Sequence, residues 1–327
     1  MFGSLGHMRS AHGRGMSHAI AAALVIVISV AVAGCASSRH RSAFKRPTVA
    51  ARRVARVRKP RPLPAPQLPR GGRTVLPGRL VVAYYGVPGT LNILGKTWDP
   101  EADALGVERR AAQYAGFGLA VQPAFELVTT VASPYPGPDG TYSAAIQASI
   151  VQRYRAAAHR HKLLLILDFQ PGRGEFLAEV KRYASLLGDP SVGVGLDPEW
   201  KLSATEVPDA VLGKSSAAGI NAVSSYLAHL VASHRLPQKM FVIHEFKTSE
   251  LPDRQNIAIR PGLATVLQMD GFGAVSDKLK SFRAVTRNAN RFHIGFKLFL
   301  DRTDDPVLLS ARQVMGLRPR PEYISYQ

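Results

Sequence analysis

Short apolar runs alternate with stretches of helical periodicity from Leu80 to the end of the chain. Runs such as LLLILDF, at Leu163–Phe169, are apolar on both faces, which is typical of strands buried within a parallel sheet. The pattern predicts eight strands. They span Leu80–Gly86, Leu119–Val131, Leu163–Phe169, Val192–Asp197, Met240–Phe246, Leu263–Asp270, Phe292–Leu300 and Glu322–Tyr326.

Seven connections, mostly helical, separate these strands. Asp99 and Pro100 form a typical helix start, and Gly188 with Pro190 forms a typical helix end. The helical patterns span Pro100–Tyr114, Tyr142–His161, Glu175–Leu187, Ser215–Ser233, Asp277–Asn288 and Pro306–Met315, and a weaker one covers Asp253–Ile259.

This alternation predicts an α/β fold, either a closed barrel or a doubly wound open sheet. The number of strands and the size of the region favour a (β/α)8 TIM-like barrel. No helical pattern follows the last strand, so we expect a barrel that lacks its last helix. The segment before the first strand would cover that side, or it would stay open. Gly193 and Gly195 suit crowded positions in the barrel interior.

The positive charge lies mainly at one end of the chain. Of 42 Lys and Arg residues, 14 lie in residues 1–75, which contain no Asp or Glu. Residues 76–327 carry 28 basic and 23 acidic residues, a net charge of +5. A chain with a net charge of +19 would usually suggest nucleic acid. Because the predicted domain is nearly balanced, we expect no nucleic-acid partner, and we expect a monomer.

The N-terminus has the pattern of a signal peptide. Its first 18 residues are basic without an acid, and Ala19–Ala33 is an apolar run too short for a comfortable membrane span. The run leads into the sequence VAGC, whose last residue, Cys35, is the only cysteine. This junction resembles a bacterial lipobox. The alternatives are an uncleaved membrane anchor and an incidental Cys35.

The lipobox resemblance implies cleavage before Cys35 and a lipid on its thiol. Acyl chains such as palmitate would then hold the lipoprotein at the extracytoplasmic face of the cell membrane. Residues 35–75 are rich in Arg and Pro, which predicts a disordered tether that adheres to an anionic envelope. We therefore divide the chain into a signal peptide (1–34), a tether (35–75) and a barrel domain (76–327).

Polar residues gather where the predicted strands end. The carboxyl ends of parallel barrel strands form one rim, and catalytic residues lie there. Any one of these residues alone can cap a helix or loop, but their recurrence at one rim favours a binding cleft. The candidate substrate-binding residues are Tyr85, Asp168, Gln170, Trp200, Gln268, Asp270, Lys297 and Tyr326.

The sequence DPEW at 197–200 carries the most specific chemistry. Residues i and i+2 of a strand face the same side, so the Cα atoms of Asp197 and Glu199 would lie about 6.5 Å apart. Mutual repulsion keeps a proton on one of two such carboxylates near neutral pH, as glycoside hydrolysis requires. Trp200 offers a face for a sugar ring. Glu245, at the end of the next strand, is a candidate second catalytic carboxylate. The competing interpretation is a loop cap and a surface ion pair.

An Asp-x-Glu pair that ends the fourth strand of a barrel resembles the chitinases of glycoside hydrolase family eighteen and the muramidases of family twenty-five. The resemblance implies that Glu199 is the general acid and that Asp197 supports it or the acetamido group of the substrate. The family-eighteen aspartates upstream of Asp197 are missing, and Tyr85 stands near the position of the family-twenty-five strand-one aspartate. The chain is similar to a divergent glycoside-hydrolase-like barrel that acts on a cell-envelope or extracellular glycan.

Two other functions stay open at this point. The same rim can hold a glycan or peptide without turnover, which would make the protein a non-catalytic binding lipoprotein. Lys297, inside an apolar strand, can act as a Schiff-base amine if burial lowers its pKa. His244 beside Glu245 suggests a metal ligand, but most other histidines of the domain lie on predicted helices. We therefore expect no metal and no cofactor.

Overall fold

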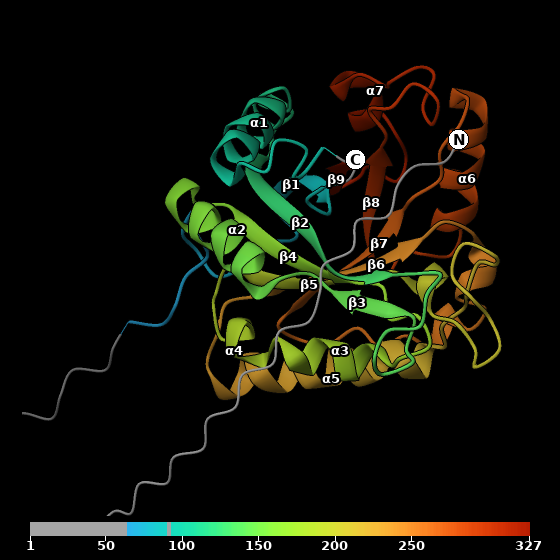
Figure 1. The fold of residues 1–327 in the computed structure, drawn as a ribbon. Coiled ribbons are helices and arrows are strands. Elements are labelled where there is room, and N and C mark those ends of the chain that lie inside the picture. The colour runs from blue at the N-terminus through green and yellow to red at the C-terminus, as the bar shows by residue number, and fades with distance from the viewer. Residues whose placement is uncertain (1–63, 90–92) are drawn as a thin grey trace, which may run out of the picture. The chain divides into compact units, whose positions relative to one another are not determined.

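The computed structural model describes residues 64–89 and 93–327. The predicted signal peptide, Cys35 and the tether up to residue 63 lie outside the described residues. Within the described ranges, no helix is both long and apolar enough to cross a membrane. This part of the chain forms a barrel of strands surrounded by helices (Figure 1).

Parallel strands close into the barrel that the alternation predicts. They follow one another in the order β1-β2-β4-β5-β6-β7-β8-β9, and β9 pairs with β1 to complete the ring. The TIM-like (β/α)8 class is therefore confirmed. The strands are β1 (Arg79–Gly86), β2 (Ala120–Ala132), β4 (Leu164–Phe169), β5 (Val192–Leu196), β6 (Lys239–Glu245), β7 (Leu263–Met269), β8 (His293–Leu298) and β9 (Tyr323–Tyr326).

Helices connect the strands around the outside of the barrel (Figure 1). The crossover after β6 contains only 3-10 turns, where the sequence predicts a weak helix, and the helix after β8 is one short turn. The helices are α1 (Pro100–Ala112), α2 (Ala148–His161), α3 (Phe176–Arg182), α4 (Ala184–Leu187), α5 (Ala217–Ser233), α6 (Val275–Thr286) and α7 (Ala311–Met315), with 3-10 helices η1 (Pro198–Trp200), η2 (Thr248–Glu250) and η3 (Arg254–Asn256).

The second helix starts later than its periodicity predicts. β2 continues to Ala132, and its last residues pair antiparallel with the short strand β3 (Ser143–Ala145). The amide of Ile146 also donates to the carbonyl of Thr129 at 3.0 Å. Residues 143–147, expected to be helical, are therefore extended, because the protruding end of β2 offers them a pairing edge, and Tyr142 before them has a left-handed backbone with a φ of 58°.

Side chains alternate between the barrel interior and the shell under the helices. On β6, Met240, Val242 and His244 point inward, whereas Phe241 and Ile243 pack under the helices. The predicted crowding at the β5 glycines is confirmed. A Cβ on Gly195 would lie 2.5 Å from Oδ1 of Asp168, so only glycine leaves room for that carboxylate inside the barrel.

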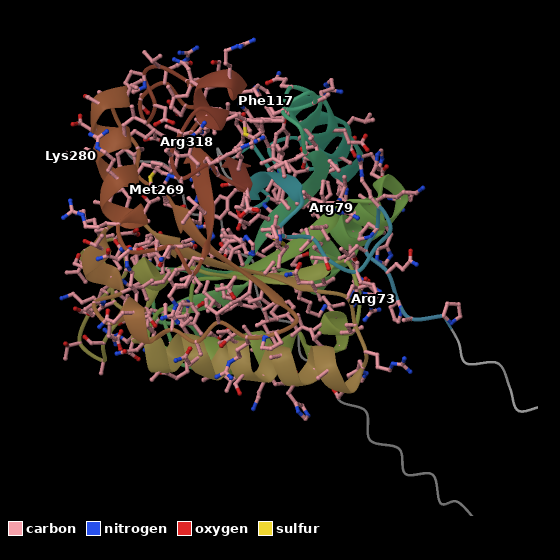
Figure 2. The ribbon with its side chains drawn as sticks, turned by 180° about the vertical axis from the view of Figure 1, so that it is seen from behind. Arg73, Arg79, Phe117, Met269, Lys280 and Arg318 are labelled. Carbon is pink, nitrogen blue, oxygen red and sulfur yellow. The ribbon has the colours of Figure 1, made fainter. Side chains whose placement is uncertain are left out.

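The segment before β1 covers the floor of the barrel, so the domain starts earlier than residue 76. Leu68 and Val75, placed in the tether from sequence, are buried in the interior cluster. Arg73 donates to the carbonyls of Arg235 and Leu236, at the end of α5 (Figure 2). The tether prediction was wrong for residues 64–75, because composition indicates disorder without showing which few apolar residues find a core.

Leu68→Ala tests this boundary. If Leu68 is part of the barrel core, the substitution lowers the free energy of unfolding by about 2 kcal/mol or more, measured by urea denaturation. Leu105→Ala, at a residue 48% exposed on α1, is the control and stays within about 0.5 kcal/mol of the wild type. An equally silent Leu68→Ala would show that residues 64–75 belong to the tether.

Candidate functional site

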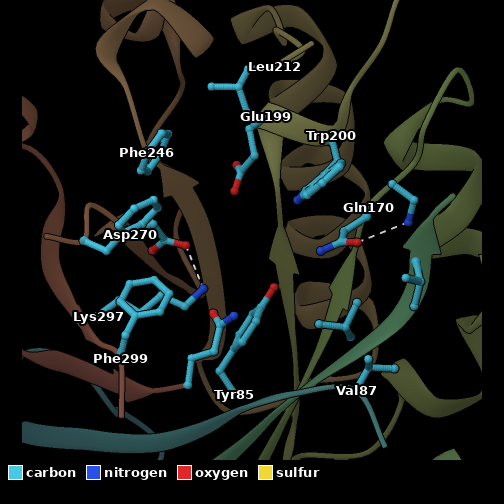
Figure 3. A pocket seen from close by; sticks show the side chains of 15 residues that line it. Tyr85, Val87, Gln170, Glu199, Trp200, Leu212, Phe246, Asp270, Lys297 and Phe299 are labelled. Atoms are coloured by element: carbon cyan, nitrogen blue, oxygen red, sulfur yellow. Dashed lines mark hydrogen bonds and ion pairs between the residues drawn. The ribbon is translucent and has the colours of Figure 1, made fainter. Parts of the chain in front are cut away.

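A cavity of about 420 Å³ opens at the carboxyl ends of the strands. Its floor carries polar side chains from β1, β4, β7 and β8, and rings and aliphatic groups form its walls. Figure 3 shows the carboxylate of Glu199 between the side of the cavity that carries Phe246 and Asp270 and the side that carries Trp200 and Gln170. Acids therefore face a largely apolar chamber, which strengthens electrostatic interactions within it.

Glu199 lies in η1, directly after β5. Pro198 ends the strand because it has no amide hydrogen to continue the ladder. The amide of Gly213 donates to the Glu199 carbonyl at 2.6 Å and ties the following loop to the rim. A Cβ on Gly213 would lie 2.1 Å from the carbonyl oxygen of Lys201, so glycine is needed for this close approach.

The Glu199 carboxyl favours its protonated form. Burial raises its pKa well above the ordinary value, and the charges of Asp197 and Asp270 raise it further, whereas His244 has a smaller opposite effect. In the described part of the chain, Oε2 of Glu199 is buried without a hydrogen-bond partner. The side chain therefore lines the cavity with a carboxyl that favours its proton, and one of its oxygens has no hydrogen-bond partner among the described residues.

Asp270 follows β7, and its carboxyl favours the ionised form. Burial alone would raise its pKa, but His244 and Lys297 together lower it to about 2. Its Oδ2 accepts from Nζ of Lys297 at 2.8 Å and from Nδ1 of His244 at 2.7 Å. Its Oδ1 accepts no hydrogen bond from any described residue. Asp270 is therefore an anion at neutral pH, with one oxygen held in place and one free.

Asp197 lies beneath these two carboxyls and is 1% exposed. The Tyr85 hydroxyl donates to its Oδ2 at 3.0 Å, and Nε2 of Gln170 donates to the same oxygen at 2.9 Å. The oxygen of Gln170 is in turn held by the amide of Ala132. Asp197 thus joins β1, β4 and β5 under the cavity.

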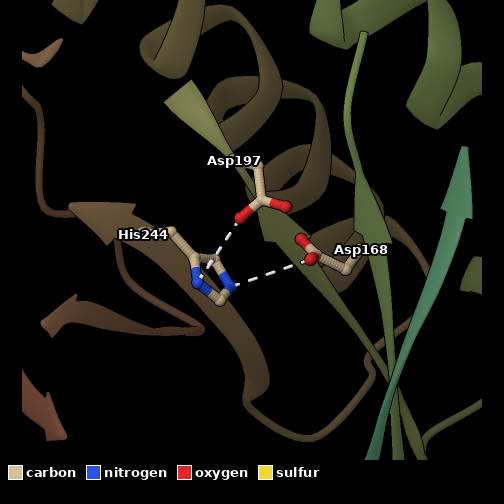
Figure 4. A group of neighbouring side chains, drawn as sticks. All are labelled: Asp168, Asp197 and His244. Atoms are coloured by element: carbon tan, nitrogen blue, oxygen red, sulfur yellow. Dashed lines mark ion pairs between the residues drawn. The ribbon is translucent and has the colours of Figure 1, made fainter. Parts of the chain in front are cut away.

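His244 is fully buried in the centre of this group. Besides Asp270, its Nδ1 lies 3.4 Å from Oδ1 of Asp197, and its Nε2 lies 3.2 Å from Oε1 of Glu126 and 3.8 Å from Oδ2 of Asp168 (Figure 4). Burial lowers the pKa of His244, but these four carboxyls outweigh it and raise the pKa well above its ordinary value.

Three carboxyls converge where the sequence predicts a cleft. Asp197, Glu199 and Asp270 each offer an oxygen, and these atoms lie within 4.8 Å of one another. A second trio with similar spacing, Asp168, Asp197 and His244, suits a metal poorly because both ring nitrogens already face carboxyls. At the first trio, the Lys297 ammonium and the His244 ring already lie against Asp270, in the positions that a metal's charge would take.

The structure corrects the predicted position of Glu245. It lies on the outer face of β6, buried under the crossover, where Nη1 of Arg254 donates to its Oε2 at 2.6 Å. The sequence placed it in the mouth beside Glu199. The strand alternation puts its neighbour His244 there instead, so Glu245 is separated from the cavity by the wall of the barrel.

Tyr326 and Gln268 also lie away from the cavity. Tyr326 points outward from β9, and its hydroxyl lies 2.6 Å from that of Tyr114. Gln268 points inward but lies deeper, where its Nε2 donates to Oγ of Ser325 at 2.7 Å. The other predicted substrate-binding residues except Asp168 line the cavity, and Asp168 lies in the layer beneath it.

Lys297 does not have the environment of a Schiff-base amine. Its Nζ lies 2.8 Å from Oδ2 of Asp270 and 3.4 Å from the centre of the Tyr85 ring. Burial lowers its pKa, but the charges of Asp270, Asp197 and Glu126 raise it above the ordinary value. An amine held as ammonium is not a nucleophile, so the lowered pKa that the Schiff-base alternative requires is not met.

Several residues of the site were missed in the sequence. Glu126 lies in the middle of β2, inside the predicted strand Leu119–Val131, and was not singled out there. Glu250 is 1% exposed in η2, and its charge acts on Glu199. Phe246, Phe272 and Phe299 form one wall of the cavity, with the first two rings stacked 5.3 Å apart. A carboxylate inside a strand core was the one available signal for Glu126.

Comparisons with known proteins assign no family. No protein-family model matches the chain, and no curated protein matches it. Among solved structures, an HpcH/HpaI aldolase from Desulfitobacterium hafniense is 13% identical with a TM-score of 0.38, covering 76% of this chain and 86% of its own. A broad-specificity GH5-4 endoglucanase from an uncultured bovine rumen ciliate is 10% identical with a TM-score of 0.35, covering 67% and 76%. Both TM-scores lie below 0.5, so neither similarity assigns an activity.

Glu250 gives this end of the barrel a pH-dependent stability. Burial raises its pKa to about 7, against the amides of Lys247 and Phe246, which lower it. The folded chain therefore keeps a proton that the unfolded chain has lost, and this contribution disappears as the pH rises from about 4.5 to about 7. Glu250→Gln removes this dependence. The free energy of unfolding of the variant, relative to that of the wild type, should rise by about 2 to 3 kcal/mol between pH 4.5 and pH 8, as measured by urea denaturation.

Glu175→Gln, which removes a carboxylate that is 70% exposed and pairs with Lys201 at 3.1 Å, is the control for the loss of a surface charge. If the free energy of unfolding of Glu250→Gln differed from that of the wild type by the same amount at every pH, the carboxyl of Glu250 would not be protonated in the folded protein.

Proposed function

We propose that the protein hydrolyses a glycosidic bond, with Glu199 as the general acid and Asp270 as the carboxylate on the other side of the bond. The observation that carries the proposal is the contrast between these two acids at one cavity. Environments that drive the pKa values of two neighbouring carboxyls apart are typical of acid and base assignments in hydrolases. Glu199 is held protonated and Asp270 is held ionised, and each has an oxygen without a partner among the described residues.

The spacing of the two carboxyls supports retention of configuration. One oxygen of each lies within 4.8 Å of the other, a proximity that fits the separation of about 5 to 5.5 Å between the carboxyls of retaining glycosidases better than the wider range of inverting ones. Oδ1 of Asp270 would bond to the anomeric carbon while Glu199 gives its proton to the departing oxygen. Ionised Glu199 would then take a proton from water, whose oxygen displaces Asp270.

Asp197 supports this pair from below. Its charge is one of the causes that keep Glu199 protonated. Tyr85 and Gln170 hold one of its oxygens, and the other accepts no hydrogen bond from the described residues. This agrees with the supporting part that the Asp-x-Glu resemblance implies for it. Asp270 takes the place for which the sequence proposed Glu245.

The walls suit sugar rings. The faces of sugar rings carry C–H groups that pack against aromatic rings, and Trp200 and Phe246 lie on opposite sides of Glu199 (Figure 3). Hydrogen-bonding groups are few and lie at the floor, as in small-ligand sites where apolar walls bind and a few polar groups orient. We therefore expect a glycan of the cell envelope or its surroundings as the substrate.

Activity measurements on peptidoglycan and chitin-type oligomers test the proposal. We expect Glu199→Gln and Asp270→Asn each to lower kcat by about 10² to 10⁴-fold, the range of acid and nucleophile substitutions. Glu245→Gln is the control, because it changes a buried carboxyl on the outer face of the barrel, away from the cavity. It should retain activity if it folds.

Product stereochemistry followed by NMR should show retention. An active Glu199→Gln would remove Glu199 as the acid. Glycan binding without turnover by the wild type would favour the alternative, a non-catalytic binding lipoprotein on the same barrel.

We further propose that the barrel is carried at the cell envelope by lipid on Cys35. The support is the leader described above, with a short apolar run that ends at the only cysteine. A lipid anchor and a long basic tether would hold the barrel near anionic polymers of the wall, within reach of a glycan substrate.

Cys35→Ser tests the anchor. Without the thiol, the chain should take up no radiolabelled palmitate, and it should keep its uncleaved leader or leave the membrane fraction. A matched Ser37→Ala variant keeps both the label and the membrane location. Labelling that survives in Cys35→Ser would contradict lipidation at this residue.

A further inference from the structure

We propose that His244 is a fixed imidazolium beneath the cavity, and that it is the positioning residue that keeps Asp270 anionic and aimed at the substrate. The first half of this inference stands on the geometry of the ring alone. The second half rests on the proposed function, because it assigns to Asp270 a part in the reaction.

Both nitrogens of the ring lie at hydrogen-bond distance from a carboxyl, an arrangement that suits a ring with two N–H groups. Nδ1 lies 2.7 Å from Oδ2 of Asp270, and Nε2 lies 3.2 Å from Oε1 of Glu126. An ionised carboxylate only accepts hydrogen bonds, and a neutral imidazole donates from only one nitrogen. Both contacts are satisfied at once when both nitrogens carry a proton, which is the imidazolium form.

Charged and titratable groups surround the ring on every adjoining strand. Glu126 on β2, Asp168 on β4, Asp197 on β5 and Asp270 after β7 approach its two nitrogens, each within 3.8 Å. The other neighbours are Tyr85 on β1, whose ring centre lies 5.7 Å away, and Lys297 on β8, which shares Asp270 with it. Four acids against one further cation favour a positive ring, in agreement with the direction of its pKa.

The ring also fixes which oxygen of Asp270 is available. His244 and Lys297 both donate to Oδ2, so Oδ1 is the oxygen left without a hydrogen-bond partner among the described residues. A lysine has one charged end, whereas the planar ring donates in two opposite directions and bridges carboxyls across the barrel. His244 thereby joins the reacting carboxyl to Glu126, which lies deeper in the interior and does not reach the cavity.

Removing the positive ring should move the acidities of both reacting groups in the same direction. Its charge lowers the pKa of Asp270 and also that of Glu199. In the proposed reaction, Asp270 must be ionised and Glu199 protonated, so they set the acidic and basic limbs of the pH–rate profile. A structural role alone would reduce the rate without moving either limb.

Nitrogen NMR of the ring tests the first half on the full wild-type chain, labelled with ¹⁵N-histidine. Among the six histidines of the described residues, His244 is the fully buried one, so its N–H protons should exchange slowly and identify it. We expect both ring nitrogens to keep their protons up to pH 8, about 1.5 units above the usual pKa of histidine. A neutral ring at pH 7 would overturn the inference, whatever activity the protein shows.

The pH profile of kcat/KM tests the second half. In His244→Gln, both limbs should move to higher pH by about 1 to 3 units, as expected for loss of a neighbouring opposite charge. Limbs that stay in place in a folded His244→Gln would overturn the positioning role. If that variant does not fold, Glu126→Gln replaces it. Glu126 does not line the cavity, and removing its carboxyl should lower the pKa of the His244 ring in the same NMR measurement. An unchanged pKa would contradict an imidazolium held by the surrounding acids.

The two proposals fail in different ways. A charged ring together with an active Glu199→Gln would leave the imidazolium standing and remove the hydrolase mechanism. A neutral ring together with an inactive Glu199→Gln would do the reverse.

Discussion

Repulsion among buried carboxylates is the constraint on which the rest of the site depends. Like charges a few ångströms apart in a poorly polarisable interior cannot all ionise. Two cations, His244 and Lys297, lie against Asp270 and offset part of this charge, and burial favours the protonated forms of Asp168 and Glu199. Burial and the charge of Asp197 raise the pKa of Asp168, and Glu199 is raised in the same way. Asp270 is therefore ionised and Glu199 protonated because the two cations lie against Asp270 and not against Glu199. The interior acids are Glu126, Asp168, Asp197, Glu199 and Asp270.

Glycines at neighbouring positions of the barrel leave space for the polar groups of this layer. Gly195 leaves space for the carboxylate of Asp168, and Gly295 leaves space for the amide of Gln268, where a Cβ would lie 1.8 Å from its oxygen. Below this polar layer the interior is apolar, and the segment that contains Leu68 and Val75 covers the floor. Burial of this layer, in which Asp168, Asp197 and His244 are at most 1% exposed, shifts its protonation states because buried charged groups lose their hydration.

Alternation along the chain predicted the barrel because helical and strand periods differ and each was repeated seven or eight times. The same periodicity could not place individual residues on β6, since MFVIHEF is apolar on both faces and shows no alternation that would separate inside from outside. An error of one residue in assigning the inward-facing positions of β6 places Glu245 in the cavity instead of His244, and this changes the predicted catalytic residues. Asp197 and Glu199 do lie together, with oxygens within 4.8 Å, but Glu199 belongs to the 3-10 helix η1 and not to the strand on which the same-side argument relied.

The sequence by itself determined the fold class, the rim at which polar residues meet, and the pairing of Asp197 with Glu199, because these depend on local order along the chain. The tertiary structure decided which second carboxyl reaches Glu199, that Lys297 is held as an ammonium, and that Glu126 and His244 belong to the site. These outcomes depend on which faces of β2, β6 and β8 turn inward and on distances between strands far apart in sequence. Such distances are set only when the barrel closes.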